Sequence, residues 1–214
     1  MIAAILLAAG SARRFGGPQK LLALVPFRDA HAPLVRAAAA PLADPAIGEL
    51  IVVLGPEPER VREAMADVPA RFVRNEHHAL GMASSIHAGV RAAARDGAWT
   101  HLDGLLVALG DQPLGGAVVR ALVDRFRALP PAAMPGSVVV PRYDGTAGHP
   151  VLFGRDVIPE LLSVAGDRGG RAVVERDPGR VHHVELAYAA MPDVDTPEDL
   201  RRLITLTSRA GAGG

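Results

Sequence analysis

The sequence predicts an α/β protein built as a three-layer α/β/α sandwich around a mostly parallel sheet. Apolar runs of strand length alternate along the chain with segments of helical spacing. The runs are continuously apolar, as in strands buried on both faces, so helices must cover both sides of the sheet. With 214 residues, 49% of them hydrophobic, the chain can bury one substantial core.

Six short apolar runs are the expected strands, and they occupy residues 2–8, 50–54, 71–74, 105–109, 137–141 and 181–186. The segments between them carry apolar residues three and four positions apart, which favours amphipathic helices. Helices are expected at residues 34–42, 58–66, 82–95, 116–128, 155–162, 170–176 and 197–206. The proline-rich stretch LPPAAMPG at 129–136 continues neither element and is expected to be a loop.

We expect residues 1–206 to form a single domain and residues 207–214, TSRAGAGG, to form a flexible tail. Basic and acidic residues balance at 23 each, so no global field attracts nucleic acid or an anionic membrane. The chain contains no cysteine, no signal-peptide pattern and no apolar run long enough to cross a bilayer. These features predict a cytoplasmic protein without nucleic-acid or membrane partners.

The stretch LAAGSARRFGGPQK at residues 7–20 follows the first expected strand and combines glycines with cations. Backbone N–H groups of such a loop can converge on an oxyanion, and Arg14 and Lys20 add charges that suit a polyphosphate. The spacing matches neither GxGxxG nor a Walker A loop. A phosphate loop of another type is favoured, with a solvated loop as the alternative.

Two acidic segments follow later expected strands. Asp111, in VALGDQP, lies just past a buried strand, where a Mg²⁺ ion bridging phosphates would need an oxygen ligand. A turn aspartate before proline explains this position equally well. In PDVDTPEDL at 192–200, Asp195 or Thr196 can cap the helix that begins at Pro197, whose dipole favours acidic residues in its first turn.

Two further segments carry polar residues at element boundaries. Ser84 and Ser85, in NEHHALGMASSIHAG, can either satisfy free amides at a helix start or bind a ligand. His149, in YDGTAGHPVLF, has a fixed backbone and an open approach, although most lone histidines are structural. The pairs His77–His78 and His182–His183 are not expected to bind metal, because adjacent side chains of an extended chain point to opposite faces.

Five motifs, in order between residues 7 and 200, resemble nucleotidyltransferases related to the molybdenum-cofactor cytidylyltransferase and guanylyltransferase. They are LAAGSARRFGGPQK, N-x5-GM-x-x-S, GDQP, GHP and DVDTP. A further segment, GDRGGR, resembles a family loop that usually has alanine at Gly170. The form LAAG resembles the cytidylyl enzymes, because guanylyl enzymes usually carry a second glycine where Ala9 stands. Ala12 replaces a residue that is often serine, and the spacing from Gly16 to Lys20 is closer to the guanylyltransferase loop.

The resemblance implies a Rossmann-like sheet of the nucleotide-diphospho-sugar transferase type and a role for each motif. The implied catalytic residues are Arg14, Lys20 and Asp111. The implied nucleotide-binding residues are Leu7, Ala8, Ala9, Gly10, Arg14, Lys20, Asn75, Gly81, Met82, Ser85 and Gly110. The implied acceptor-binding residues are Gly148, His149, Pro150, Asp167 and Arg171. The implied Mg²⁺ ligands are Asp111 and Asp195, with Asp193 in reserve because a two-residue spacing puts both carboxylates on one side of an extended chain.

The expected activity is a Mg²⁺-dependent transfer of CMP from CTP to molybdopterin cofactor, with release of pyrophosphate. The expected partners are CTP or another NTP, a molybdopterin-type acceptor and a recipient molybdoenzyme. A guanylyltransferase, or another transferase with a small acceptor, would share the phosphate machinery. An NAD(P)-dependent oxidoreductase is an alternative of another class, because some relatives of this family carry that name, but the dinucleotide fingerprint is missing. A non-catalytic cofactor chaperone is the remaining alternative.

Overall fold

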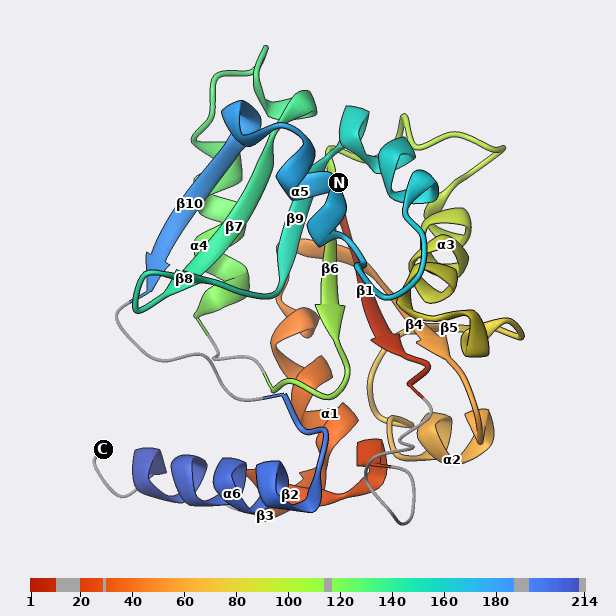
Figure 1. Cartoon of the computed structure of the whole chain (residues 1–214), viewed down its shortest axis with the longest axis vertical. Coiled ribbons are helices and arrows are strands. Elements are labelled where there is room, and N and C mark those ends of the chain that lie inside the picture. The colour runs from red at the N-terminus through yellow and green to blue at the C-terminus, as the bar shows by residue number, and fades with distance from the viewer. Residues whose placement is uncertain (11–19, 29, 114–116, 187–192, 212–214) are drawn as a thin grey trace.

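The central sheet is built around β1 (Ile2–Ala8), in which every residue is buried. The computed structural model describes residues 1–10, 20–28, 30–113, 117–186 and 193–211. Within them the sheet has the strand order β10-β7-β9-β6-β1-β4-β5, and β8 pairs with β7 at one side (Figure 1). The other strands are β4 (Ile47–Leu54), β5 (Arg71–Arg74), β6 (Gly104–Leu109), β7 (Val138–Tyr143), β8 (Thr146–Ala147), β9 (Val151–Gly154) and β10 (Val181–Leu186).

Parallel pairing dominates the sheet, as expected. β1 pairs in parallel with both β4 and β6, which places the ends of these three strands at one edge. Two strands are exceptions: β9 lies antiparallel between β6 and β7, and the short β8 pairs antiparallel with β7. The sequence did not predict β9, because four apolar residues after a turn do not reveal their direction or partner. The predicted three-layer, mostly parallel architecture is confirmed.

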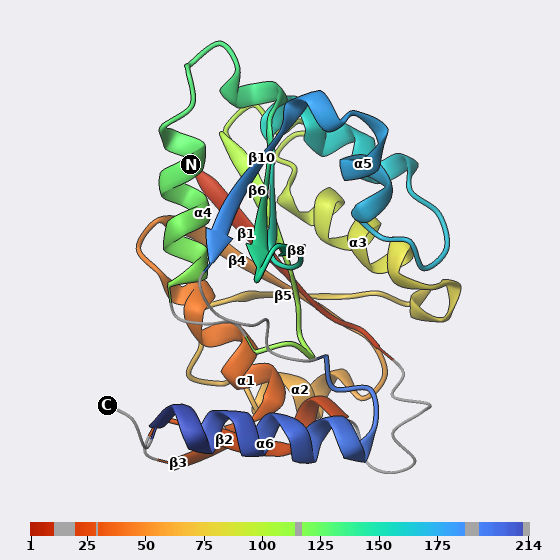
Figure 2. The same cartoon turned by 60° about the vertical axis from the view of Figure 1, so that its left-hand side comes forward.

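Helices cover both faces of the sheet (Figures 1 and 2). Ile2, Ala4, Leu6 and Ala8 of β1 join one core cluster with the helices α1 (Leu34–Ala39), α2 (Pro58–Glu63) and α4 (Val118–Arg127). Ala3, Ile5 and Leu7 join the opposite cluster with α3 (Met82–Ala93), η5 (Arg155–Ser163) and α5 (Arg171–Arg176). The alternation follows from the period of two along a strand, and it explains why β1 is apolar throughout.

A smaller unit lies at the carboxyl ends of the strands (Figure 1). It consists of an antiparallel hairpin, β2 (Leu24–Phe27) and β3 (Ala30–Pro33), and the helix α6 (Pro197–Gly211). Val25, Leu34, Ala37, Val194 and Leu203 form its core cluster. The hairpin was not predicted, and α6 runs past its expected end at residue 206, so the segment expected to be a tail begins as helix.

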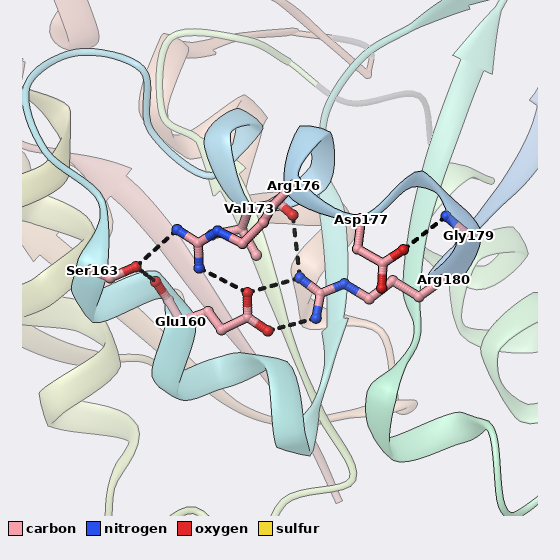
Figure 3. Close-up of polar contacts among 7 residues, drawn as sticks. All are labelled: Glu160, Ser163, Val173, Arg176, Asp177, Gly179 and Arg180. Carbon is pink, nitrogen blue, oxygen red and sulfur yellow. Dashed lines mark hydrogen bonds and ion pairs between the residues drawn. The ribbon is translucent and has the colours of Figure 1, made fainter.

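A polar cluster ties η5 to the chain that follows it (Figure 3). The carboxylate of Glu160 accepts hydrogen bonds from Arg176 at 3.0 Å and from Arg180 at 2.8 Å. Arg176 also donates to the Ser163 hydroxyl at 3.1 Å. η5 was predicted as an α-helix but is a 3₁₀ helix with Pro159 inside it, which fits the missing N–H of proline.

In the part of the chain that the structure describes, no helix is both long and apolar enough to span a membrane.

Candidate active site

A buried lysine joins two carboxylates at the carboxyl ends of β1 and β6. Lys20, at the start of η1 (Lys20–Leu22), is 6% exposed. Its Nζ donates to Asp111 Oδ2 at 2.6 Å and to Asp195 Oδ1 at 2.8 Å. Asp111 follows β6, and Asp195 precedes α6, so distant parts of the sequence meet at one ammonium group. The structure therefore brings together three residues to which the sequence assigned phosphate and metal binding.

The two carboxylates of this cluster determine the charge state of Lys20. Burial acts to lower the pKa of Lys20, but the charges and hydrogen bonds of Asp111 and Asp195 outweigh it and hold the pKa above its ordinary value. Lys20 therefore stays protonated at neutral pH. Lys20 is also the only lysine in a chain that otherwise uses arginine for its basic residues.

Asp193 adds a third carboxylate beside this pair. Desolvation, followed by the negative charges of Asp111 and Asp195, raises the pKa of Asp193 to about 6. Three carboxylates face one ammonium group, so the cluster carries surplus negative charge at pH 7. Carboxylate oxygens are ligands that suit Mg²⁺, which completes its shell with phosphate and water. Among the described residues, no three acidic or histidine side chains are already arranged as a metal site.

A cavity of about 300 Å³ opens beside the cluster. It lies between the end of β1, the start of α3 and the acidic residues. The residues that line it are Leu7, Ala9, Gly10, His78, Gly81, Met82, Ser85, Leu109, Asp111, Asp167, Asp193 and Asp195. Most of the residues expected to bind a nucleotide thus border one cavity.

Gly81 and Asp167 shape the wall formed by the start of α3. The Met82 N–H donates to Asp167 Oδ1 at 3.2 Å, and the Ala83 N–H donates to the Gly166 carbonyl at 3.0 Å. Gly81 has a φ of +94°, and a Cβ atom there would lie 2.5 Å from Asp167 Oδ1. Asp167 was expected at the acceptor, but it lines the same cavity as the residues expected at the nucleotide.

Asn75 supports this wall from behind. It is 4% exposed, and its amide donates to Ser84 at 2.9 Å and to Ser85 at 3.0 Å. Its Oδ1 accepts a hydrogen bond from the His77 N–H at 3.0 Å. Ser85 borders the cavity, whereas Asn75 does not, so Asn75 orients the residues expected to contact the nucleotide.

The remaining predicted residues lie around the cavity or away from it. The His149 carbonyl accepts a hydrogen bond from the Tyr143 hydroxyl at 2.6 Å, and the peptide bond to Pro150 is cis. Burial lowers the pKa of His149, while the charge of Asp111 acts in the opposite direction. Arg171 pairs with Glu175 at 2.7 Å and has an 80% exposed side chain, so it does not border the cavity.

Ala8 and Gly110 have packing roles. Ala8 is fully buried, and the Gly110 N–H donates to the Leu7 carbonyl at 2.9 Å, where β1 and the end of β6 approach closely. Gly148 leaves no room for a Cβ atom, which would lie 2.9 Å from the Tyr143 ring. Arg14 lies outside the described residues.

Sequence reasoning missed His78, which was considered only as a metal ligand. His78 lines the cavity, and its Nδ1 atom is buried without a hydrogen-bond partner in the described structure. Its position in the sequence could have indicated this, because His78 lies three residues before Gly81, and both line the cavity wall at the start of α3.

Comparisons with known proteins agree with this architecture. Residues 4–184 match the MobA-like NTP transferase domain. The nicotine blue oxidoreductase of Paenarthrobacter nicotinovorans is 33% identical over 214 residues, covering 95% of this chain and 96% of the relative. The crystal structure of an Rv0371c homologue from Mycobacterium sp. strain JC1 is 27% identical, covers 98% of each chain and has a TM-score of 0.79. Rv0371c of Mycobacterium tuberculosis H37Rv, in complex with manganese, is 28% identical, with coverage of 95% of this chain and 98% of that chain and a TM-score of 0.72.

Proposed function

The chain belongs to the MobA-like NTP transferase family, and from that premise we propose that it transfers CMP from CTP to a molybdopterin-type acceptor in a Mg²⁺-dependent reaction. The observation that carries the proposal is the meeting of Lys20, Asp111 and Asp195 beside the cavity. A cation and carboxylates at one point are what a metal-bound triphosphate requires.

The proposed reaction is an in-line displacement at the α-phosphorus. A phosphate oxygen of the acceptor attacks, the bond from the α-phosphorus to the bridging oxygen breaks, and pyrophosphate leaves with that electron pair. Because a phosphate nucleophile is already ionised, the reaction needs no strong general base, and the protein contributes positioning and charge neutralisation. Lys20 stays protonated and suits the negative charge of the phosphates.

Asp111 and Asp195 would hold the metal ion, with Asp193 beside them. A divalent ion held there would supply charge neutralisation for the phosphates. Support for a divalent ion comes from the surplus negative charge of the cluster and from the manganese complex of Rv0371c, a relative of this chain.

The preference for CTP rests on the segment LAAG, in which Ala9 borders the cavity. A cytidine base and ribose would lie along the start of α3, near Gly81, Met82 and Ser85. The acceptor would approach from the side of His149, whose imidazole lies within the field of Asp111.

Pyrophosphate release measured over CTP, GTP, ATP and UTP tests this proposal. With Mg²⁺ and molybdenum-loaded pterin, we expect turnover with CTP and much less with the other nucleotides. Turnover with GTP instead would replace the cytidylyl assignment with a guanylyl one. No pyrophosphate with any nucleotide would reject the transferase and favour a cofactor chaperone.

A second candidate is favoured by one specific observation, the name of the 33% identical relative, nicotine blue oxidoreductase. An oxidoreductase of that kind would consume a reduced nicotinamide cofactor, which is followed by absorbance with a quinone-type dye as acceptor. We expect no oxidation above the buffer rate, because no GxGxxG fingerprint follows a strand. Saturable oxidation that Asp111→Asn leaves intact would favour this second function.

A further inference from the structure

A second cavity, of about 360 Å³, lies between the end of β5 and one side of α3. Its size falls in the range that small molecules occupy in proteins, roughly 300 to 1,000 Å³. It is lined by Arg74, Asn75, Glu76, His77, Leu80, Ser84, His87, Ala88 and Arg91. It shares no lining residue with the candidate active site, although Asn75 and Ser84 of this cavity adjoin Ser85 of the other.

The second cavity is rich in cationic and hydrogen-bonding groups. Arg74 and Arg91 form no side-chain hydrogen bond or ion pair with any described residue. Arg71, in the same strand as Arg74, instead pairs with Glu49 at 3.0 Å. Glu76 is the single acidic residue among those that line the cavity, so its charge is outweighed by the two guanidinium groups.

Two further features point to a ligand. The Nε2 atom of His87 is buried and has no hydrogen-bond partner among the described residues. Leu80, also in the lining, is 71% exposed, which is unusual for a large apolar side chain. A molecule with an anionic group and an apolar body would satisfy the arginines and cover Leu80.

We infer that this second cavity binds a small phosphate-bearing molecule through Arg74 and Arg91. Guanidinium groups present paired N–H donors that match phosphate oxygens. Neither arginine has a carboxylate partner among the residues that the structure describes, so both can make those bonds. The site is separate from the nucleotide cavity and does not depend on the proposed transferase activity. The Asn75 amide and the Ser84 hydroxyl form the part of its wall nearest the candidate active site.

Histidine signals in nuclear magnetic resonance can locate the anion, because the two cavities hold different histidines. His77 and His87 line the second cavity, whereas His78 lines the first. Titration with inorganic phosphate at constant pH and ionic strength should shift the His77 and His87 ring signals along a saturable curve. A phosphate that binds only near Lys20 would shift His78 or His149 and leave His77 and His87 unchanged, and that result would overturn the inference.

The double variant Arg74→Gln/Arg91→Gln should weaken phosphate binding, as seen at His77 and His87, by at least about tenfold, the effect of losing charge-assisted hydrogen bonds. Arg95→Gln is the matched control, since Arg95 is an exposed arginine just after α3 and outside the cavity. Both replaced arginines are exposed, so the fold should survive, which an unchanged melting temperature would verify. Equal affinity in the double variant and in Arg95→Gln, or equal shifts with sodium chloride, would reject the site.

Discussion

At the scale of single residues, the Lys20 ammonium is held by the same two carboxylates that we propose as ligands of a Mg²⁺ ion. The two carboxylates hold the pKa of the buried Lys20 above its ordinary value, so the lysine stays charged. Replacing Asp111 or Asp195 therefore changes the net charge of the cluster and the charge that Lys20 can offer to a phosphate.

Asp111→Asn should lower kcat by about 10²-fold or more, within the range found when one charged group of a preorganised site is removed. The fold should persist, because asparagine keeps the shape and the acceptor oxygen. Pyrophosphate release and the melting temperature measure the two effects. Asp124→Asn, an exposed carboxylate on α4, should retain full activity. Near-normal turnover of Asp111→Asn would remove this residue from the proposed metal site.

Asp193→Asn should raise the melting temperature of metal-free protein at pH 7.5. Folding raises the pKa of Asp193 from 3.8 to about 6, so the native state binds more protons than the unfolded state between these values. Ionised Asp193 therefore lowers stability above pH 6, and asparagine removes that cost. Well below pH 4, Asp193 is protonated and neutral in both the native and the unfolded state, so the difference in melting temperature between Asp193→Asn and the unchanged protein should vanish. A stabilisation that is equal at pH 4 and pH 7.5 would contradict this account.

At the scale of elements, the start of α3 depends on a turn that is distant in sequence. Asp167 accepts a hydrogen bond from the first turn of α3, and Gly81 leaves space for its carboxylate. This junction forms one wall of the candidate nucleotide cavity, and the Glu160 cluster anchors the elements on either side of the turn.

Gly81→Ala should raise the KM for the nucleotide and lower stability by about 1 to 3 kcal/mol, because a Cβ atom would strain a positive φ and press on Asp167. Gly97→Ala is the matched control, because Gly97 also has a positive φ, +76°, but no atom lies within 4 Å of an added Cβ. Gly97→Ala should lower stability but leave the KM for the nucleotide unchanged. An unchanged KM in Gly81→Ala would show that this wall does not contact the nucleotide.

Glu160→Gln should lower stability by about 1 to 2 kcal/mol, between the effects typical of exposed and buried ion pairs. The change leaves Arg176 and Arg180 without their shared carboxylate (Figure 3). Glu198→Gln breaks a pair whose side chains are 80% and 69% exposed and should change little. Folding should lower the pKa of Glu160, because Arg180 and Arg176 favour its ionised form. The contribution of Glu160 to the free energy of unfolding should therefore be lost as the pH falls through this depressed pKa. Equal denaturation midpoints for the two variants would contradict this role.

Comparison of the elements shows what could be read from the sequence. Strands such as β1 were predicted because uninterrupted apolar residues identify burial on both faces. β9 and the β2–β3 hairpin were missed because short segments gain their structure from partners far along the chain. The residues of the Lys20 cluster were predicted from motifs at strand ends. The position of Asp167 was not, since it depends on how the turn before α5 docks onto α3.

At the scale of the whole molecule, the two ends of the chain close the candidate site. Lys20 and Asp195 are 175 positions apart, and α6 packs on the β2–β3 hairpin through Val25, Val194 and Leu203. The C-terminal helix thus holds Asp195 in place as well as covering apolar surface.

Leu203→Ala should lower stability by about 2 to 4 kcal/mol and reduce activity at temperatures where the protein remains folded. Leu203 is fully buried, and its loss loosens the packing that positions Asp195. Leu122→Ala, an equally buried leucine of α4 in another core cluster, should lose stability but keep its kcat. If both variants kept full activity when folded, α6 would have no part in positioning the site.

The solitary lysine also makes the site chemically addressable. An amine-selective reagent finds one lysine side chain in this sequence, that of Lys20. A protonated amine that donates hydrogen bonds to two carboxylates is acylated slowly. A ligand that binds those carboxylates, or that covers the amine, therefore changes the rate of acylation at Lys20. The mass of a single labelled peptide would then report occupancy of the site before any product has been identified.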